Sequence, residues 1–140
     1  MGPTLVNDAL RDIDPAQLNR PNDEGWSVRD IVVHLADTET MRAVRFGLVL
    51  AEDEPDLPLL NEKLWKRKLH YMWRSPEAAL ALFTETRFAM GELLRQCDLK
   101  SWERGGLHPE LGRLTVADLV RRGVVHVDEH VAQIEAMRRR

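Results

Sequence analysis

Cysteine and long apolar runs are scarce in this chain of 140 residues, and each shortage excludes a class of protein. The single cysteine, Cys97, cannot form an internal disulfide or a cysteine-based zinc framework, and it suits a reducing compartment. No run approaches the roughly 18 apolar residues that a membrane span needs, and the N-terminus lacks the basic start and apolar core of a secretion signal. We therefore expect a cytoplasmic protein with no membrane partner.

Strong charge of one sign is also missing, because the formal net charge is only −3. Such a chain has no overall electrostatic attraction for nucleic acid. Segment 63–75, KLWKRKLHYMWRS, is locally basic, but its large apolar residues fit an inward helical face: Trp65, Leu69, Met72 and Trp73. We interpret the basic side as solvated or paired with acidic residues, and we expect no nucleic-acid partner.

Helical signals are plentiful, whereas sustained period-2 alternation is absent. Apolar spacing predicts four principal helices over about 4–13, 28–51, 76–96 and 116–137. Ser27 with Asp30, and Thr115 with Asp118, have the spacing of capping boxes at two of the helix starts. Segments 14–25 and 98–113 are rich in turn-forming residues and read as loops. The sequence predicts an all-α, single-domain four-helix bundle spanning residues 1–140.

Three histidines are predicted to face the interior of this bundle. His126 and His130 lie four positions apart, which is about 40° around a helix, so they share one face. His34, in the helix that begins near residue 28, is in phase with the inward-facing Ile31. Polar groups buried without a partner cost about 1–3 kcal/mol each, so the imidazoles need either separate hydrogen bonds or one shared ion. Both interpretations stay open on spacing alone.

Polar residues near the histidines are candidates for supporting contacts. Thr38 and Gln133 share the inner face and could orient a ring N–H or a substrate, although ordinary packing or hydrogen bonding is the more common role of such residues. Asp37 lies about 60° from His34 and is the better acidic candidate for a supporting contact. Glu39 lies about 140° away, so we do not expect it to join the cluster.

The stretches GWSVRDIVVHLADTE, GRLTVADLV and HVDEHVAQI, together with NEKLW and Arg87, resemble the DinB/YfiT-like superfamily. The resemblance covers most of the chain, and the first predicted helix is shorter than is usual in the family. It implies a four-helix bundle, often a homodimer, in which His34, His126 and His130 hold a divalent metal. Zinc, nickel and iron all accept imidazole ligands, so the residues do not choose among them.

Three neutral imidazoles leave a metal ion with its full charge and an open position, which is typical of catalytic sites. The resemblance implies a metal-dependent enzyme that acts on a small-molecule substrate. A low-molecular-weight thiol, such as bacillithiol or mycothiol, is an expected cofactor of an S-transferase or isomerase. A metal-dependent hydrolase, a noncatalytic metal-binding stress-response protein and a metal-free helical dimer stay as alternatives. The sequence identifies no catalytic residue beyond the metal site.

Overall fold

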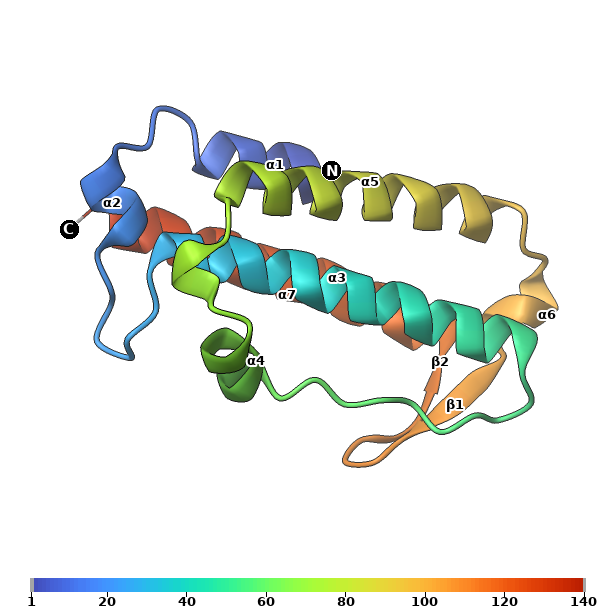
Figure 1. Cartoon of the computed structure of the whole chain (residues 1–140). Helices are drawn as coiled ribbons and strands as arrows, with labels where there is room; N and C mark the ends of the chain where they lie inside the picture. Colours follow the sequence, from blue (N-terminus) through green and yellow to red (C-terminus); the bar gives the residue numbers. More distant parts are fainter. Residues whose placement is uncertain (1, 140) are drawn as a thin grey trace.

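Four helices form the body of the protein in the computed structural model, which describes residues 2–139 (Figure 1). They are α1 (Gly2–Ala9), α3 (Val28–Ala51), α5 (Pro76–Arg95) and α7 (Val116–Arg138). Helix α3 packs against both α5 and α7, and α1 lies against α5 and α7. The connections contain α2 (Pro15–Asn19), α4 (Glu62–Lys68), the 3-10 helix η1 (Tyr71–Trp73) and α6 (Leu99–Trp102). Within residues 2–139, no helix is long and apolar enough to cross a membrane.

The two long helices that carry the histidines begin at capping boxes, as the sequence predicts. The Ser27 hydroxyl accepts from the Asp30 amide at 3.1 Å, and the Asp30 carboxylate accepts from the Ser27 amide at 2.9 Å. Thr115 and Asp118 repeat both bonds at the start of α7. Each box satisfies two amides that have no partner within the helix. The start of each helix is therefore fixed, and with it the direction of every later side chain.

Two apolar clusters fill the interior. The larger one joins α1, α3, α5 and α7 and includes Ile31, Leu35, Phe83 and Ile134. The smaller one lies at the other end of α3 and includes Phe46 and Leu119. Burying a side chain of this size stabilises the fold by about 1.5–3 kcal/mol, so these clusters hold α3 beside α7.

A short hairpin lies where the sequence predicted only a loop, so the all-α expectation missed it. Strand β1 (Gly105–His108) pairs antiparallel with β2 (Gly112–Thr115). The strands are four residues long and contain three glycines, which leaves too few side chains for a detectable alternation. A Cβ on Gly106 would lie 2.8 Å from the Pro55 carbonyl oxygen, so the close approach of β1 to the segment after α3 requires glycine.

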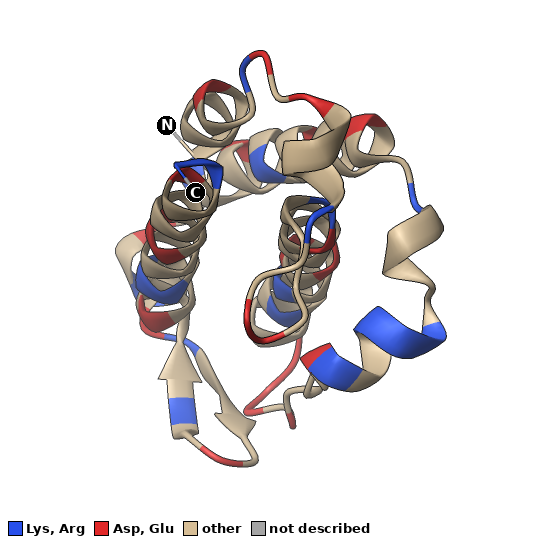
Figure 2. Cartoon of the chain, turned by 90° about the vertical axis from the view of Figure 1, so that its left-hand side faces the viewer, with Lys and Arg blue, Asp and Glu red and all other residues tan. Residues whose placement is uncertain are grey.

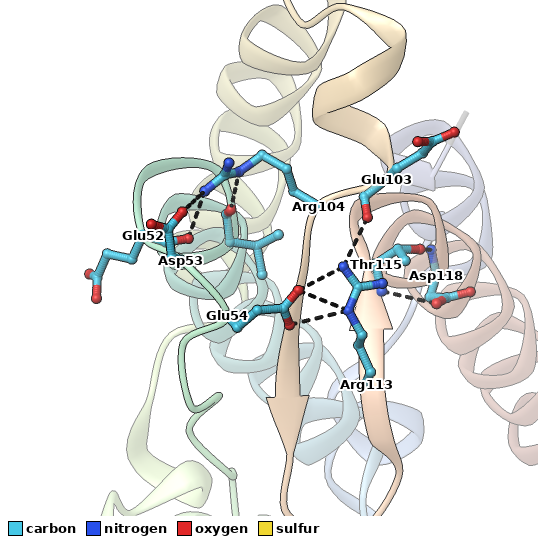
Figure 3. A network of polar contacts seen from close by, with 9 residues as sticks. Glu52, Asp53, Glu54, Glu103, Arg104, Arg113, Thr115 and Asp118 are labelled. Atoms are coloured by element: carbon cyan, nitrogen blue, oxygen red, sulfur yellow. Dashed lines mark hydrogen bonds and ion pairs between the residues drawn. The ribbon is translucent and has the colours of Figure 1, made fainter.

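Two arginines fasten this hairpin to the end of α3 (Figure 3). Arg104 donates to the carbonyl oxygens of Val49 and Glu52 at 2.9 and 2.8 Å. Arg113, on β2, donates to both carboxylate oxygens of Glu54 at 2.9 to 3.1 Å. Exposed ion pairs contribute little energy individually, but the geometry here is bidentate and several bonds act together. The hairpin is thereby held beside α3.

The segment between α3 and α5 departs from the prediction. Helix α4 stands apart from the bundle and carries a concentration of basic residues (Figure 2). Met72 and Trp73 are 70% and 77% exposed, so their predicted inward orientation is wrong, and Leu69 is exposed as well. The predicted continuous apolar face does not form because the chain turns at His70, which has φ of 50°. Tyr71 is the fully buried aromatic residue of this segment, and Trp65 packs against the larger core cluster.

Candidate metal centre

The structure brings the three predicted histidines together between two facing helices. His34 comes from α3, and His126 and His130 come from α7. The Nε2 atom of His126 lies 3.1 Å from the Nε2 atoms of both His34 and His130. A ligand atom from each residue lies within 4.8 Å of the other two, so the group could hold a metal ion. Their role as ligands stays a prediction, whereas their convergence is a feature of the fold.

Burial keeps two of the imidazoles neutral. It lowers the pKa of His34 to about 4, and the adjacent His130 acts in the same direction. It lowers the pKa of His126 to about 2, with further contributions from His130 and His34. The charged form is disfavoured because the rings have lost water and face one another. At neutral pH both rings therefore have a nitrogen lone pair available for a Lewis acid.

The hydrogen-bonding capacity of His126 fits a shared ion better than separate hydrogen bonds. A ring nitrogen carries either one proton or one lone pair, so Nε2 of His126 cannot make good hydrogen bonds to two Nε2 atoms at once. Its Nδ1 is buried and has no hydrogen-bond partner among the described residues. One cation would accept all three Nε2 lone pairs together. The residues present therefore suit a borderline divalent metal.

Gln133 fixes the orientation of one ring. Its Oε1 lies 2.8 Å from Nδ1 of His130, so Nδ1 donates and Nε2 presents its lone pair to the cluster. This contact agrees with the predicted possibility that Gln133 orients a ring N–H. Thr38 Oγ1 lies 3.5 Å from Nδ1 of His34, which is a weaker contact of the same kind.

The two acidic residues near His34 have other partners. Asp37 accepts from Arg74 at 2.7 and 2.9 Å and from the Tyr71 hydroxyl at 2.8 Å. It has no hydrogen bond to a histidine, so its predicted supporting contact is wrong, although its charge acts to raise the pKa of His34. Glu39 stays outside the cluster, as predicted.

Glu39 instead occupies a buried ion network that joins three helices. It is 2% exposed and pairs with Arg42 at 2.8 Å and with Arg87 at 2.9 Å. Arg87 also donates to the Gly123 carbonyl oxygen on α7 at 2.9 Å. This network explains the arginine of α5 that contributed to the family resemblance, because it ties α5 to both helices that carry histidines.

Sequence reasoning missed one acidic residue near the cluster. Glu62, at the start of α4, has its Oε2 3.7 Å from Nε2 of His34, and its side chain is 56% exposed. It belongs to the NEKLW stretch of the family resemblance, but nothing in its spacing from the histidines places it there. Asn61 caps α4 by accepting from the Leu64 amide, which fixes where Glu62 lies.

An open cleft with a volume of about 640 Å³ adjoins the cluster. His34, His126 and Glu62 line one part of it, and the remaining lining comes from α3, α7, the hairpin and the chain before α4. This volume accommodates a small organic molecule. The site therefore combines convergent imidazoles, a nearby carboxylate and room for a ligand.

A helical bundle with convergent imidazoles on facing helices belongs to the class of bundles that build metal or ligand sites in their core. The chain is a member of the DinB superfamily, whose family model matches residues 2–134. "Putative metal-dependent hydrolase YfiT" of Bacillus subtilis (strain 168) is 31% identical over 140 residues, covering 99% of this chain and 79% of that protein. A Bacillus cereus (strain 03BB102) protein, "Putative metal-dependent hydrolase", is 28% identical over 139 residues, covering 99% and 80%.

Solved structures confirm the predicted four-helix bundle. YfiT, described as "a probable metal-dependent hydrolase with an unusual four-helix bundle topology", superimposes with a TM-score of 0.93 at 31% identity, covering 99% of this chain and 80% of that one. A mycothiol-dependent maleylpyruvate isomerase gives a TM-score of 0.77 at 14% identity, covering 95% and 56%. The second likeness shows a shared fold alone.

Proposed function

We propose that His34, His126 and His130 hold a divalent metal ion, and that the protein is a metal-dependent enzyme acting on a small molecule. The convergence of three Nε2 atoms beside an open cleft carries this proposal. When bound, the ion would supply Lewis acidity toward a water, a thiol or a carbonyl group. The name of the YfiT relative supports hydrolysis as the first reaction to test.

The chain's own residues have separable roles in this proposal. Gln133 holds the ring of His130 with its Nε2 toward the centre. Glu62 is placed to take up or return a proton at the mouth of the cleft, because its carboxylate is half-exposed and close to His34. Leu59, Leu60 and Val125 line the cleft and would exclude water from part of a bound substrate.

Metal analysis of protein purified without a polyhistidine tag tests the first half of the proposal. We expect about one ion per chain after reconstitution, with zinc, nickel and iron tried in parallel. His126→Ala and His130→Ala should each lose most of the affinity, because each removes one of three ligands. A ratio far below one ion per chain would instead support the metal-free bundle.

Activity assays on the metal-loaded protein test the second half. A panel of small esters and amides probes hydrolysis, and a panel of electrophiles with bacillithiol or mycothiol probes S-transfer. The bundle shared with a mycothiol-dependent isomerase is the observation that keeps thiol chemistry as the second candidate. A metal-loaded protein inactive in both panels would favour the noncatalytic metal-binding alternative.

A homodimer and a cytoplasmic location are further parts of the proposal. Exposed apolar side chains lie around a hollow bordered by α1, α5 and α7, where Phe88 is 62% and Val124 50% exposed. Such exposed apolar area is typical of a subunit interface. Sedimentation equilibrium should give twice the chain mass, and Phe88→Glu should give a monomer. Cell fractionation tests the location.

A further inference from the structure

The part of the cleft beyond the histidines is lined by arginines. Arg42 and Arg45 follow His34 and Thr38 along the same side of α3, and Arg122 lies four residues before His126 on α7. Residues four apart on a helix share a face one turn apart. Both helices therefore carry positive charge into the cleft on the side of the hairpin, next to the candidate metal centre.

Two of these charges have no acidic partner. Arg42 pairs with Glu39 at 2.8 Å, so it has an acidic partner. Arg45 donates through Nε and Nη2 to the Pro58 carbonyl oxygen at 3.0 and 2.7 Å, which fixes its guanidinium but leaves its charge uncompensated. Arg122 makes no hydrogen bond or ion pair with the residues between 2 and 139 that the structure describes.

The two uncompensated arginines influence one another across the cleft. Burial, followed by the charges of Arg42 and Arg122, lowers the pKa of Arg45. Glu110 and Glu129 also line the cleft, but neither lies within ion-pair distance of Arg45 or Arg122. An anion placed between the two guanidinium groups would relieve their repulsion and form charge-assisted hydrogen bonds.

His108, on the hairpin, contributes a donor to the same region. It is 8% exposed, and its Nδ1 accepts from the amides of Glu110 and Leu111, both at 3.1 Å. With Nδ1 acting as an acceptor, the neutral ring carries its proton on Nε2. That N–H has no hydrogen-bond partner among the residues described, and the ring lines the cleft. A cleft-lining donor with no partner among the described residues, beside two arginines without an acidic partner, points to a ligand that accepts hydrogen bonds.

We propose that Arg45, Arg122 and His108 form an oxyanion subsite, so that the substrate of this cleft carries a carboxylate or a phosphate group. Arg122 lies one helical turn from His126, about 6 Å along α7. In a bound substrate, the anionic group would therefore be separated by a few bonds from the atom that reacts at the histidine cluster. The placement of the reacting end depends on the proposed metal-dependent function. The binding of the anion does not.

Calorimetric titration with two probes, succinate and inorganic phosphate, tests the subsite. Each probe is titrated at low ionic strength into zinc-loaded protein and into protein without added metal. We expect saturable binding in both states, weakened at least tenfold by Arg122→Gln and by Arg45→Gln, because each removes a charge-assisted donor. Arg11→Gln is the matched control, since it removes one exposed arginine that pairs with Asp8 and does not line the cleft. It should change binding less than twofold.

The outcomes separate the subsite from the metal proposal. Tighter binding of succinate assigns a carboxylate, and tighter binding of phosphate assigns a phosphate. The proposal is overturned if neither probe saturates, if all variants bind as the wild type does, or if binding appears only with zinc and ignores the arginines. Failure to load zinc would overturn the metal proposal. The titration of metal-free protein would still decide whether the anion subsite exists. Arg122 is exposed and makes no hydrogen bond with the described residues, so Arg122→Gln should fold normally. A loss of binding in this variant therefore reports the lost charge and not misfolding.

Discussion

Acidification should destabilise the metal-free protein through the histidine cluster. The pKa values of His34 and His126 fall to about 4 and about 2 in the fold, whereas the ordinary value is 6.5. The unfolded chain therefore binds more protons than the folded chain between pH 6.5 and pH 4. The stability associated with these two rings is present above pH 6.5 and is lost as the pH falls. From pH 7 to pH 5 the loss is about 2 kcal/mol per ring, or about 3–4 kcal/mol together.

Urea unfolding followed by circular dichroism at pH 7 and pH 5 measures this loss. His126→Gln should show about half of the wild-type change in unfolding free energy, because one of the two rings is gone. His70→Gln is the matched control, since it removes a histidine that stacks on Trp73 outside the cluster. If the unfolding free energy of the wild type falls by less than about 1 kcal/mol, the reasoning is refuted. The rings would then accept protons in the folded protein, so their pKa values would not be lowered by the fold.

Three substitutions test other parts of the structure. Gln133→Leu should weaken metal binding by about 10–100-fold while keeping one ion per chain, because the ring of His130 loses its orienting bond; an unchanged titration would contradict this role. Gly106→Ala should lower the unfolding free energy by about 1–3 kcal/mol, since its methyl group meets the Pro55 carbonyl, and an unshifted urea midpoint would argue against that contact. Glu39→Gln should destabilise by about 3–5 kcal/mol, because buried Arg42 and half-buried Arg87 lose their shared counter-ion; a thermal melt like that of the wild type would exclude this role.

The histidine cluster was accessible to sequence reasoning because a helix is rigid. Once the caps at Ser27 and Thr115 fix where α3 and α7 begin, the direction of every later side chain follows from 3.6 residues per turn. The same geometry kept Glu39 out of the cluster. Spacing could not show that His34 meets His126 across two helices, and the family resemblance supplied that link.

Other features depended on contacts between distant parts of the chain. Asp37 lies at a suitable angle on α3, but Arg74 and Tyr71 bind it from a segment more than thirty residues later. The turn at His70 changes the direction of a segment whose apolar spacing looked continuous. Local patterns carry no information about such partners, so the outward orientation of Trp73 could not be predicted.

The hairpin shows the same limit with a greater consequence for function. Its strands are too short and too rich in glycine to be recognised, yet they bring His108 to the cleft. The arginines that hold the hairpin to α3 are scattered among ordinary loop residues. The contribution of His108 to the cleft is therefore visible only in the structure, whereas the three imidazoles of the cluster were predicted from the sequence.

Trp26 is an intrinsic fluorescent reporter located at the histidine cluster. Its ring meets that of His34 edge-on, with 5.6 Å between the ring centres. Nickel and iron have partly filled d shells and would quench indole emission at this range, whereas zinc, with a filled shell, would leave it bright. Comparing the fluorescence of the native chain with that of Trp26→Phe during metal titration would thus report both occupancy and the kind of ion, without any added dye.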